Sequence, residues 1–210
     1  MNARGAARAA ILGRIASALA DAPEPVEVPR TYHRTTPVGV DVVELFAERV
    51  ADYRATVHRA APATLSAVVA RVLADRGVRR LVVPAGLPVA WLTEVVAERI
   101  GDQPPLSHRE LDEADAVISS CAVAIAETGT IVLDGGPGQG RRALSLLPDR
   151  HLCVVGADRI VGDVPEAVAW LDPHRPLTWI SGPSATSDIE LERVEGVHGP
   201  RILDVVIVAD

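Results

Sequence analysis

The four residues Leu152-Cys153-Val154-Val155 decide the fold class, because they form an apolar run without a polar position. A strand with one face in water alternates apolar and polar residues, whereas a strand covered on both faces reads as a continuous apolar run. The same unbroken pattern recurs in four other short segments: Leu81-Val82-Val83, Ala116-Val117-Ile118, Ile131-Val132-Leu133 and residues 205–208. Helical patterns separate these runs, so we expect an α/β fold with an open, largely parallel sheet flanked by helices.

The helices between the runs have recognisable start signals. Asp41 can cap a helix that extends to about residue 58, and Thr64 can cap a second helix over residues 65–75. Residues 88–100 are expected to be helical, and Pro165 suits the first turn of a helix over residues 165–171. These elements fill residues 38–210, which we expect to form a single domain.

The segment before that domain has a different character. Residues 6–19 are rich in alanine and place Ile11, Ile15 and Leu19 at helical spacing, which predicts an amphipathic helix. Its apolar stripe would pack on its own domain or on a partner subunit, and a basic helix lying on a membrane surface is the alternative. We expect residues 1–37 to form this helix and an extended linker marked by four prolines, Pro23, Pro25, Pro29 and Pro37.

Composition excludes several classes of function. A net charge of -7 and a pI near 5.4 argue against nucleic-acid binding, which needs a basic face. All 21 basic residues are arginine, so a Schiff-base lysine and a P-loop are both excluded. No signal peptide and no run of 18 apolar residues can be found, so we expect a cytoplasmic protein without a membrane span.

Cysteine and histidine usage gives no support for a metal or redox centre. Cys121 and Cys153 each lie within an apolar stretch, so we interpret them as reduced thiols of the core. Two cysteines are too few to hold an iron–sulfur cluster alone, and the six histidines show no metal-ligand spacing. We therefore expect neither a bound metal nor a cofactor.

The turn Ala126-Glu127-Thr128-Gly129-Thr130 is a candidate for chemistry. A carboxylate between two hydroxyls could act as a nucleophile or a general base, and Gly129 would let a substrate approach the backbone closely. The alternative is that Glu127 forms an ordinary ion pair with one of the many arginines.

A glycine-rich loop over residues 134–142 ends in Arg141 and Arg142. Its backbone N–H groups and two guanidinium groups could hold a carboxylate or a phosphate. The loop matches neither the Walker A motif nor the dinucleotide fingerprint. A connection between a strand and a short helix explains the glycines equally well, and the sequence does not separate these interpretations.

The third candidate segment follows an apolar run over residues 177–180. A loop at the carboxyl end of a strand is where open α/β sheets usually bind ligands. This loop offers small and polar residues able to orient a ligand: Ser181, Gly182, Pro183, Ser184, Thr186, Ser187 and Asp188. Ser187 with Glu190 also forms a capping box, so part of the cluster could simply start a helix. His198 lies in a tight turn further on, where a backbone-bonded histidine is the alternative to a functional one.

Three ordered blocks of sequence resemble the LUD-domain family, and within it the lactate-utilisation proteins. The blocks are A-I-A-E-T-G-T-I-V-L at residues 124–133, L-P-D-R-H-L-C-V-V at residues 147–155, and I-S-G-P-S-A-T-S-D-I-E at residues 180–190 with G-V-H-G-P at residues 196–200. The resemblance covers roughly residue 38 to the C-terminus and is densest from Cys121 onward. It implies a fold similar to the sugar-isomerase and CoA-transferase superfamily, with a ligand cleft. It also implies a three-protein system that oxidises L-lactate to pyruvate, in which the partner proteins carry the iron–sulfur clusters.

These observations support a leading hypothesis and two rivals. The leading hypothesis is a non-redox component of that system, which binds a small hydroxy- or keto-acid, or a partner's segment, in a cleft. The expected cleft residues are Glu127, Thr128, Thr130, Ser184, Thr186 and Asp188, with Arg141 or Arg142 as the counter-charge. One rival is a free-standing acyl or CoA transferase, since related CoA transferases use a glutamate nucleophile that Glu127 would match. The other rival is a purely structural or regulatory subunit, and in each case we expect a homo-oligomer or a hetero-complex rather than a monomer.

Overall fold

The computed structural model describes residues 3–20, 27–31, 39–183, 185–186, 194–195 and 199–209. The chain divides into two units, Met1–Tyr32 and His33–Asp210. In the first unit, residues predicted to be helical lie in helix α1 (Ala3–Ala18), and Ile11, Ile15 and Leu19 are exposed.

The larger unit is built on a six-stranded sheet in which all neighbouring strands are parallel. Four of the continuous apolar runs belong to this sheet, as predicted. Its spatial order is β1 (Thr56–Ala60), β12 (Ile202–Val208), β7 (Arg150–Gly156), β4 (Ala116–Ser119), β2 (Arg80–Val83) and β3 (Glu98–Gly101).

A second sheet of four strands holds the remaining apolar runs. Its order is β8 (Ile160–Val161), β5 (Val123–Ile125), β6 (Thr130–Leu133) and β9 (Thr178–Ile180). Strand β6 pairs antiparallel with both β5 and β9. The run over residues 177–180 therefore leads into an antiparallel sheet and not to the carboxyl edge of the parallel one. A two-stranded hairpin, β10 (Ala185–Thr186) and β11 (Val194–Glu195), is also described.

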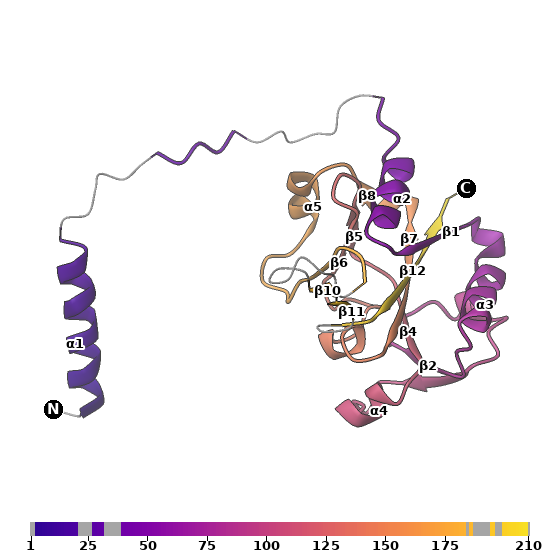
Figure 1. Cartoon of the computed structure of the whole chain (residues 1–210), viewed down its shortest axis with the longest axis horizontal. Helices are drawn as coiled ribbons and strands as arrows, with labels where there is room; N and C mark the ends of the chain where they lie inside the picture. Colours follow the sequence, from indigo (N-terminus) through magenta and orange to yellow (C-terminus); the bar gives the residue numbers. More distant parts are fainter. Residues whose placement is uncertain are drawn as a thin grey trace. The chain divides into compact units, whose positions relative to one another are not determined.

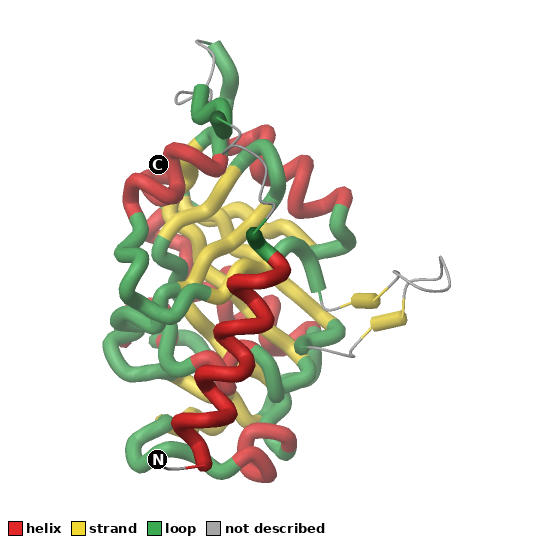
Figure 2. The backbone as a smooth tube through the Cα atoms, turned by 90° about the vertical axis from the view of Figure 1, so that its left-hand side faces the viewer, coloured by secondary structure: helices red, strands yellow, loops and turns green. Residues whose placement is uncertain are grey.

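The layers explain why both sheets read as continuous apolar sequence. Helix α3 (Leu65–Asp75) covers one face of the parallel sheet, and helix α2 (Val42–Asp52) together with the second sheet covers the other (Figure 1). The far face of the second sheet packs against α5 (Val164–Trp170). Strands of both sheets consequently lie inside the unit, as Figure 2 shows in yellow.

The prediction of a helix over residues 88–100 is wrong. That segment contains a short 3₁₀ helix, η2 (Val89–Leu92), and then strand β3 at the edge of the sheet. Leu92 and Val95 are buried, but Val96 is 99% exposed, so the segment does not present one apolar helical face. Pairing of β3 with β2 overrides the helical pattern.

The start signals of the other helices are partly confirmed. Asp41 caps α2 through hydrogen bonds from the N–H groups of Val43 and Glu44, 3.0 and 3.1 Å long. This helix ends earlier than predicted, because Arg54 adopts a positive φ of 68° and turns the chain into β1. Thr64 occupies the N-cap position of α3 but makes no side-chain capping hydrogen bond there; its hydroxyl bonds the backbone of Ala61, the residue before the 3₁₀ helix η1 (Pro62–Thr64). The helix with a proline in its first turn is confirmed as α5.

Candidate functional site

The parallel sheet has a topological switch point between β2 and β4. After β2 the chain continues to β3 on one side, and after β4 it continues toward β7 on the other side. Open α/β sheets bind ligands in the crevice outside the carboxyl ends of two such strands. The crevice here is bordered by residues 84–86 after β2 and by Ser120 after β4.

The glycine-rich loop inserts into this crevice. The N–H of Gly138 donates to the carbonyl of Ala85, and the N–H of Ser120 donates to the carbonyl of Gly138, both at 2.8 Å. A Cβ atom on Gly138 would lie 2.8 Å from the Ser120 hydroxyl, and one on Gly86 would lie 2.8 Å from the Cβ of Pro137. These glycines are therefore needed where the loop packs against the two strand ends, and the loop joins β6 to the 3₁₀ helix η3 (Arg142–Ser145).

A cavity lies on each side of the loop. The first, of about 750 Å³, is lined by Arg141, Arg142 and Arg175, and we call it the arginine cavity. The second, of about 500 Å³, is lined by Trp91 and Trp170, and we call it the tryptophan cavity. The two share a wall made of the loop residues Asp134, Gly136, Pro137 and Gln139 together with Arg175.

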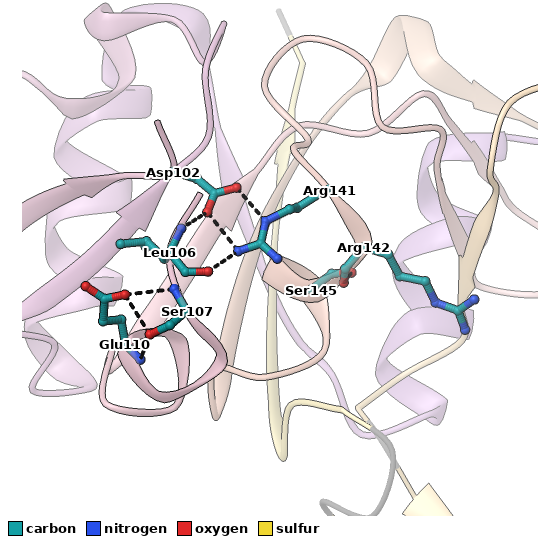
Figure 3. Close-up of polar contacts among 7 residues, drawn as sticks. All are labelled: Asp102, Leu106, Ser107, Glu110, Arg141, Arg142 and Ser145. Carbon is teal, nitrogen blue, oxygen red and sulfur yellow. Dashed lines mark hydrogen bonds and ion pairs between the residues drawn. The ribbon is translucent and has the colours of Figure 1, made fainter. Parts of the chain in front are cut away.

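Arg141 is held by protein groups and is not a free counter-charge. Its Nε and Nη2 donate to the two carboxylate oxygens of Asp102 at 2.8 and 3.0 Å, and Nη2 also donates to the carbonyl of Leu106 at 2.5 Å (Figure 3). Burial alone would raise the pKa of Asp102, but hydrogen bonds from Arg141 and from the Leu106 N–H lower it below its usual value. The same pair raises the pKa of Arg141. We conclude that Arg141 fixes the wall of the arginine cavity.

Arg142 has a different environment. Its side chain is exposed, lines the arginine cavity and points away from Arg141 (Figure 3). Arg175, the third arginine of this cavity, forms an ion pair with Asp134. Among the described residues, Arg142 is therefore the arginine of this cavity whose guanidinium has no carboxylate partner.

The structure brings together two of the sequence candidates, the turn before β6 and the loop after β9. Thr128 and Thr130 hydroxyl oxygens lie 2.7 Å apart, and Thr130 Oγ1 lies 2.8 Å from Ser181 Oγ. The antiparallel pairing of Ile131 with Ile180 creates this contact. Thr130 is buried, so its hydroxyl is satisfied inside the protein.

Gly129 and Gly182 make close contacts with the end of helix α2. A Cβ on Gly129 would lie 2.7 Å from the carbonyl carbon of Arg49, and one on Gly182 would lie 2.6 Å from the carbonyl oxygen of Tyr53. Both glycines also have positive φ angles, 58° and 80°. The backbone of α2 is thus a neighbour that requires a glycine at position 129.

Glu127 lies apart from the arginines. Its N–H donates to the carbonyl of Gly162 at 3.0 Å, while its side chain is exposed and makes no hydrogen bond or ion pair within the described part of the chain. The residue precedes β6, whereas Arg141 and Arg142 follow that strand, and Glu127 lines neither cavity. Neither of these two cavities therefore joins Glu127 to the two arginines.

The remaining candidates fall where the structure is not described. Ser184, Asp188 and His198 lie outside the described residues, as does the expected capping box of Ser187 and Glu190. Thr186 is described through its backbone alone, as part of β10.

Sequence reasoning did not identify several residues that shape the two cavities. Asp102 follows the carboxyl end of β3, a position that would have suggested a ligand site had residues 98–101 been read as a strand. Trp91 and Trp170 gave no local signal, because they line one cavity only in the folded chain.

The buried polar groups below the loop are satisfied within the core. His151 Nε2 lies 2.7 Å from Ser119 Oγ, and burial lowers the pKa of His151 to about 4. Cys121 and Cys153 are both free and buried. A hydrogen bond with Cys153, together with burial, raises the pKa of Cys121 well above its usual value. A protonated thiol is a poor nucleophile, which fits the interpretation as core thiols.

The described residues offer neither a metal site nor a membrane span. They contain no group of three His, Cys, Asp or Glu side chains that could hold a metal ion. No helix among them is long and apolar enough to cross a bilayer.

Comparisons with known proteins give consistent results. A family model described as the LUD domain matches residues 106–208. A protein named Lactate utilization protein C from Deinococcus radiodurans is 50% identical over 198 residues, which cover 92% of this chain and 90% of the relative. A protein of the same name from an Exiguobacterium species is 36% identical over 51% of this chain and 50% of its own. The crystal structure of a DUF162 family protein from Deinococcus radiodurans matches with a TM-score of 0.69 and 45% identity, covering 80% of this chain and 97% of that one.

Proposed function

Because the chain belongs to the LUD-domain family, we propose that it is a non-redox component of a cytoplasmic system that oxidises L-lactate to pyruvate. The observation that carries this proposal is the 50% identity to a Lactate utilization protein C along nearly the whole of both chains. Iron–sulfur partner proteins would carry the electrons, and this chain would bind either a small organic acid or a segment of a partner.

The arginine cavity is the binding site that we propose for that ligand. Arg142 supplies an exposed guanidinium without a carboxylate partner among the described residues, and a guanidinium can bind a carboxylate through two parallel hydrogen bonds. The neighbouring Arg141 keeps this wall in place through Asp102. A cavity of about 750 Å³ exceeds what a three-carbon acid fills, so a carboxylate on a partner's segment is accommodated as well.

Growth on L-lactate tests this proposal. A strain that lacks its own lactate utilisation protein C would be complemented with the wild-type chain, with Arg142→Gln or with Arg71→Gln. Arg71 is the matched control because it is an exposed arginine on α3 that lines neither cavity. We expect rescue by the wild type and by Arg71→Gln, and loss of rescue with Arg142→Gln at equal abundance. Full rescue by Arg142→Gln would remove the arginine cavity from the proposal and favour a purely structural or regulatory subunit.

The exposed carboxylate of Glu127, which has no partner among the described residues, supports a second candidate function, an acyl or CoA transferase with Glu127 as nucleophile. Attack of the Glu127 carboxylate on the thioester carbonyl of an acyl-CoA would break the C–S bond, release CoA as its thiolate and leave a mixed anhydride on Glu127, which hydroxylamine traps as a hydroxamate. This candidate predicts that Glu127→Gln abolishes both trapping and rescue, whereas Glu48→Gln, at an exposed position on α2, has no effect. Rescue by Glu127→Gln together with an absence of hydroxamate would exclude it.

A further inference from the structure

The tryptophan cavity gathers a rare residue type at the switch point. The chain has three tryptophans in 210 residues, and two of them, Trp91 and Trp170, line this one cavity. Trp91 comes from η2, which follows β2, and is partly buried against the main core. Trp170 is the last residue of α5; it is 53% exposed and belongs to no core cluster. The indole of Trp170 is therefore not required to fill the protein interior.

Charged groups enter the cavity from the end of a neighbouring parallel strand. Asp158 and Arg159 belong to the 3₁₀ helix η4 (Ala157–Arg159), which directly follows the carboxyl end of β7. Arg159 Nε lies 3.5 Å from Asp158 Oδ2, and their side chains are 53% and 77% exposed. An ion pair that long and that exposed contributes little, so both groups can turn toward a ligand at small cost.

This set of groups matches the parts of a nucleotide. Indole rings stack on heteroaromatic bases, and a guanidinium binds phosphate through paired hydrogen bonds. A carboxylate placed beyond a parallel strand is suited to accept hydrogen bonds from the two ribose hydroxyls. A cavity of about 500 Å³ is within the range that small-molecule ligands occupy.

We propose that the tryptophan cavity binds a nucleotide, with the base on Trp170 and Trp91, the ribose on Asp158 and the phosphate on Arg159. The glycine-rich loop separates this site from the arginine cavity, so a nucleotide and a carboxylate ligand could be bound together on the two sides of one wall. The inference does not depend on the proposed role in lactate utilisation.

Intrinsic tryptophan fluorescence of the full chain provides the test. The four ribonucleoside monophosphates would be titrated into the wild type, with the four corresponding nucleosides and ribose 5-phosphate as partial ligands. We expect saturable quenching by at least one monophosphate, weaker binding of its nucleoside and no response to ribose 5-phosphate. Trp170→Ala should weaken binding by about tenfold, since stacking on an aromatic side chain contributes on that scale. Arg159→Gln should weaken binding of the monophosphate and leave the affinity for its nucleoside unchanged.

Trp179→Phe is the matched control, because Trp179 is the third tryptophan and lines neither cavity. It should remove background fluorescence and leave the affinity unchanged. Thermal unfolding of each variant would check that the fold is retained. We expect this because Trp170 and Arg159 are exposed. The proposal is overturned if none of the four monophosphates gives saturable quenching, or if the affinity is unchanged in both Trp170→Ala and Arg159→Gln.

Discussion

The two ends of strand β6 both carry residues typical of ligand sites, but they are built differently. At the amino end, Thr130 is buried in a hydroxyl contact with Thr128 and Ser181, and Gly129 lies against helix α2. At the carboxyl end, the glycine-rich loop packs into the switch point but leaves a cavity on each side. Glycines and hydroxyls thus mark close packing as readily as binding. The cavities beside the loop are what distinguish the second end.

A substitution at the packed amino end of β6 should lower the free energy of unfolding the most. Gly129→Ala places a Cβ 2.7 Å from the carbonyl carbon of Arg49 while φ is 58°, so both a clash and a left-handed backbone must be tolerated. We expect the free energy of unfolding to fall by about 2–5 kcal/mol, measured by guanidinium chloride denaturation.

Gly77→Ala separates the two contributions to that loss. Gly77 has a similar φ of 67°, but a Cβ there meets no atom within 4 Å. The free energy of unfolding of Gly77→Ala should therefore fall only by the cost of a left-handed backbone at alanine, about 1–2 kcal/mol. Equal losses for the two variants would show that α2 relaxes freely and that the contact with Gly129 is not a packing constraint.

The free energy of unfolding should also fall with pH, because of His151 in the core below the open end. This loss should be similar to or smaller than the loss in Gly129→Ala. Burial holds the pKa of His151 at about 4, against an ordinary value of 6.5. Between these values the unfolded chain binds more protons than the folded one, so stability is full above pH 6.5 and falls as the pH drops toward 4. The loss over this window should reach about 3 kcal/mol.

Urea denaturation across that pH window checks this expectation. His151→Gln should lack this part of the pH dependence, whereas His108→Gln, at an exposed position, should retain it. An unchanged slope in His151→Gln would assign the acid sensitivity to other groups.

The neighbouring arginines give the next comparison. Arg141→Gln removes two charge-assisted hydrogen bonds from Asp102, whose side chain is only 13% exposed. We expect a loss of about 2 kcal/mol in the free energy of unfolding at neutral pH.

Acid should diminish the difference between this variant and the wild type. The lowered pKa of Asp102 means that its contribution is present above its unfolded pKa, near pH 4, and is lost as the pH falls through the lower folded value. A difference that persists unchanged to the lowest accessible pH would show that the ion pair is not its source.

Much of the fold could be predicted from the sequence because its strands are covered on both faces. The continuous runs in β2, β4, β7 and β12 predicted the parallel sheet. The same property concealed the second sheet, since β6 is also covered on both faces although it pairs antiparallel. Strand β3 was not predicted, because it is formed by pairing with β2 at the sheet edge. No local sequence pattern indicates that pairing.

The sequence motifs identified the segments that carry the candidate residues, but they did not predict which of these residues contact one another. Thr130 and Ser181 lie in two segments that the sequence singled out, yet their hydrogen bond joins residues 51 positions apart. Likewise, nothing local distinguishes Arg141 from Arg142, because the difference comes from Asp102, 39 positions away. The two tryptophans and the Asp158–Arg159 pair of the tryptophan cavity come from three separate elements, so this cavity could be found from the structure alone.

Arg142→Gln should have the smallest effect on stability and is the sharpest test of the comparison. Its guanidinium is exposed and has no carboxylate partner among the described residues, so its removal should change the free energy of unfolding by less than about 0.5 kcal/mol. Both variants would be measured by the same denaturation. The comparison tests whether the two adjacent arginines contribute differently to the free energy of unfolding, as the structure indicates. A loss equal to that of Arg141→Gln would make Arg142 a structural residue as well. The Arg142 guanidinium at the open end of β6 would then no longer support a carboxylate site there.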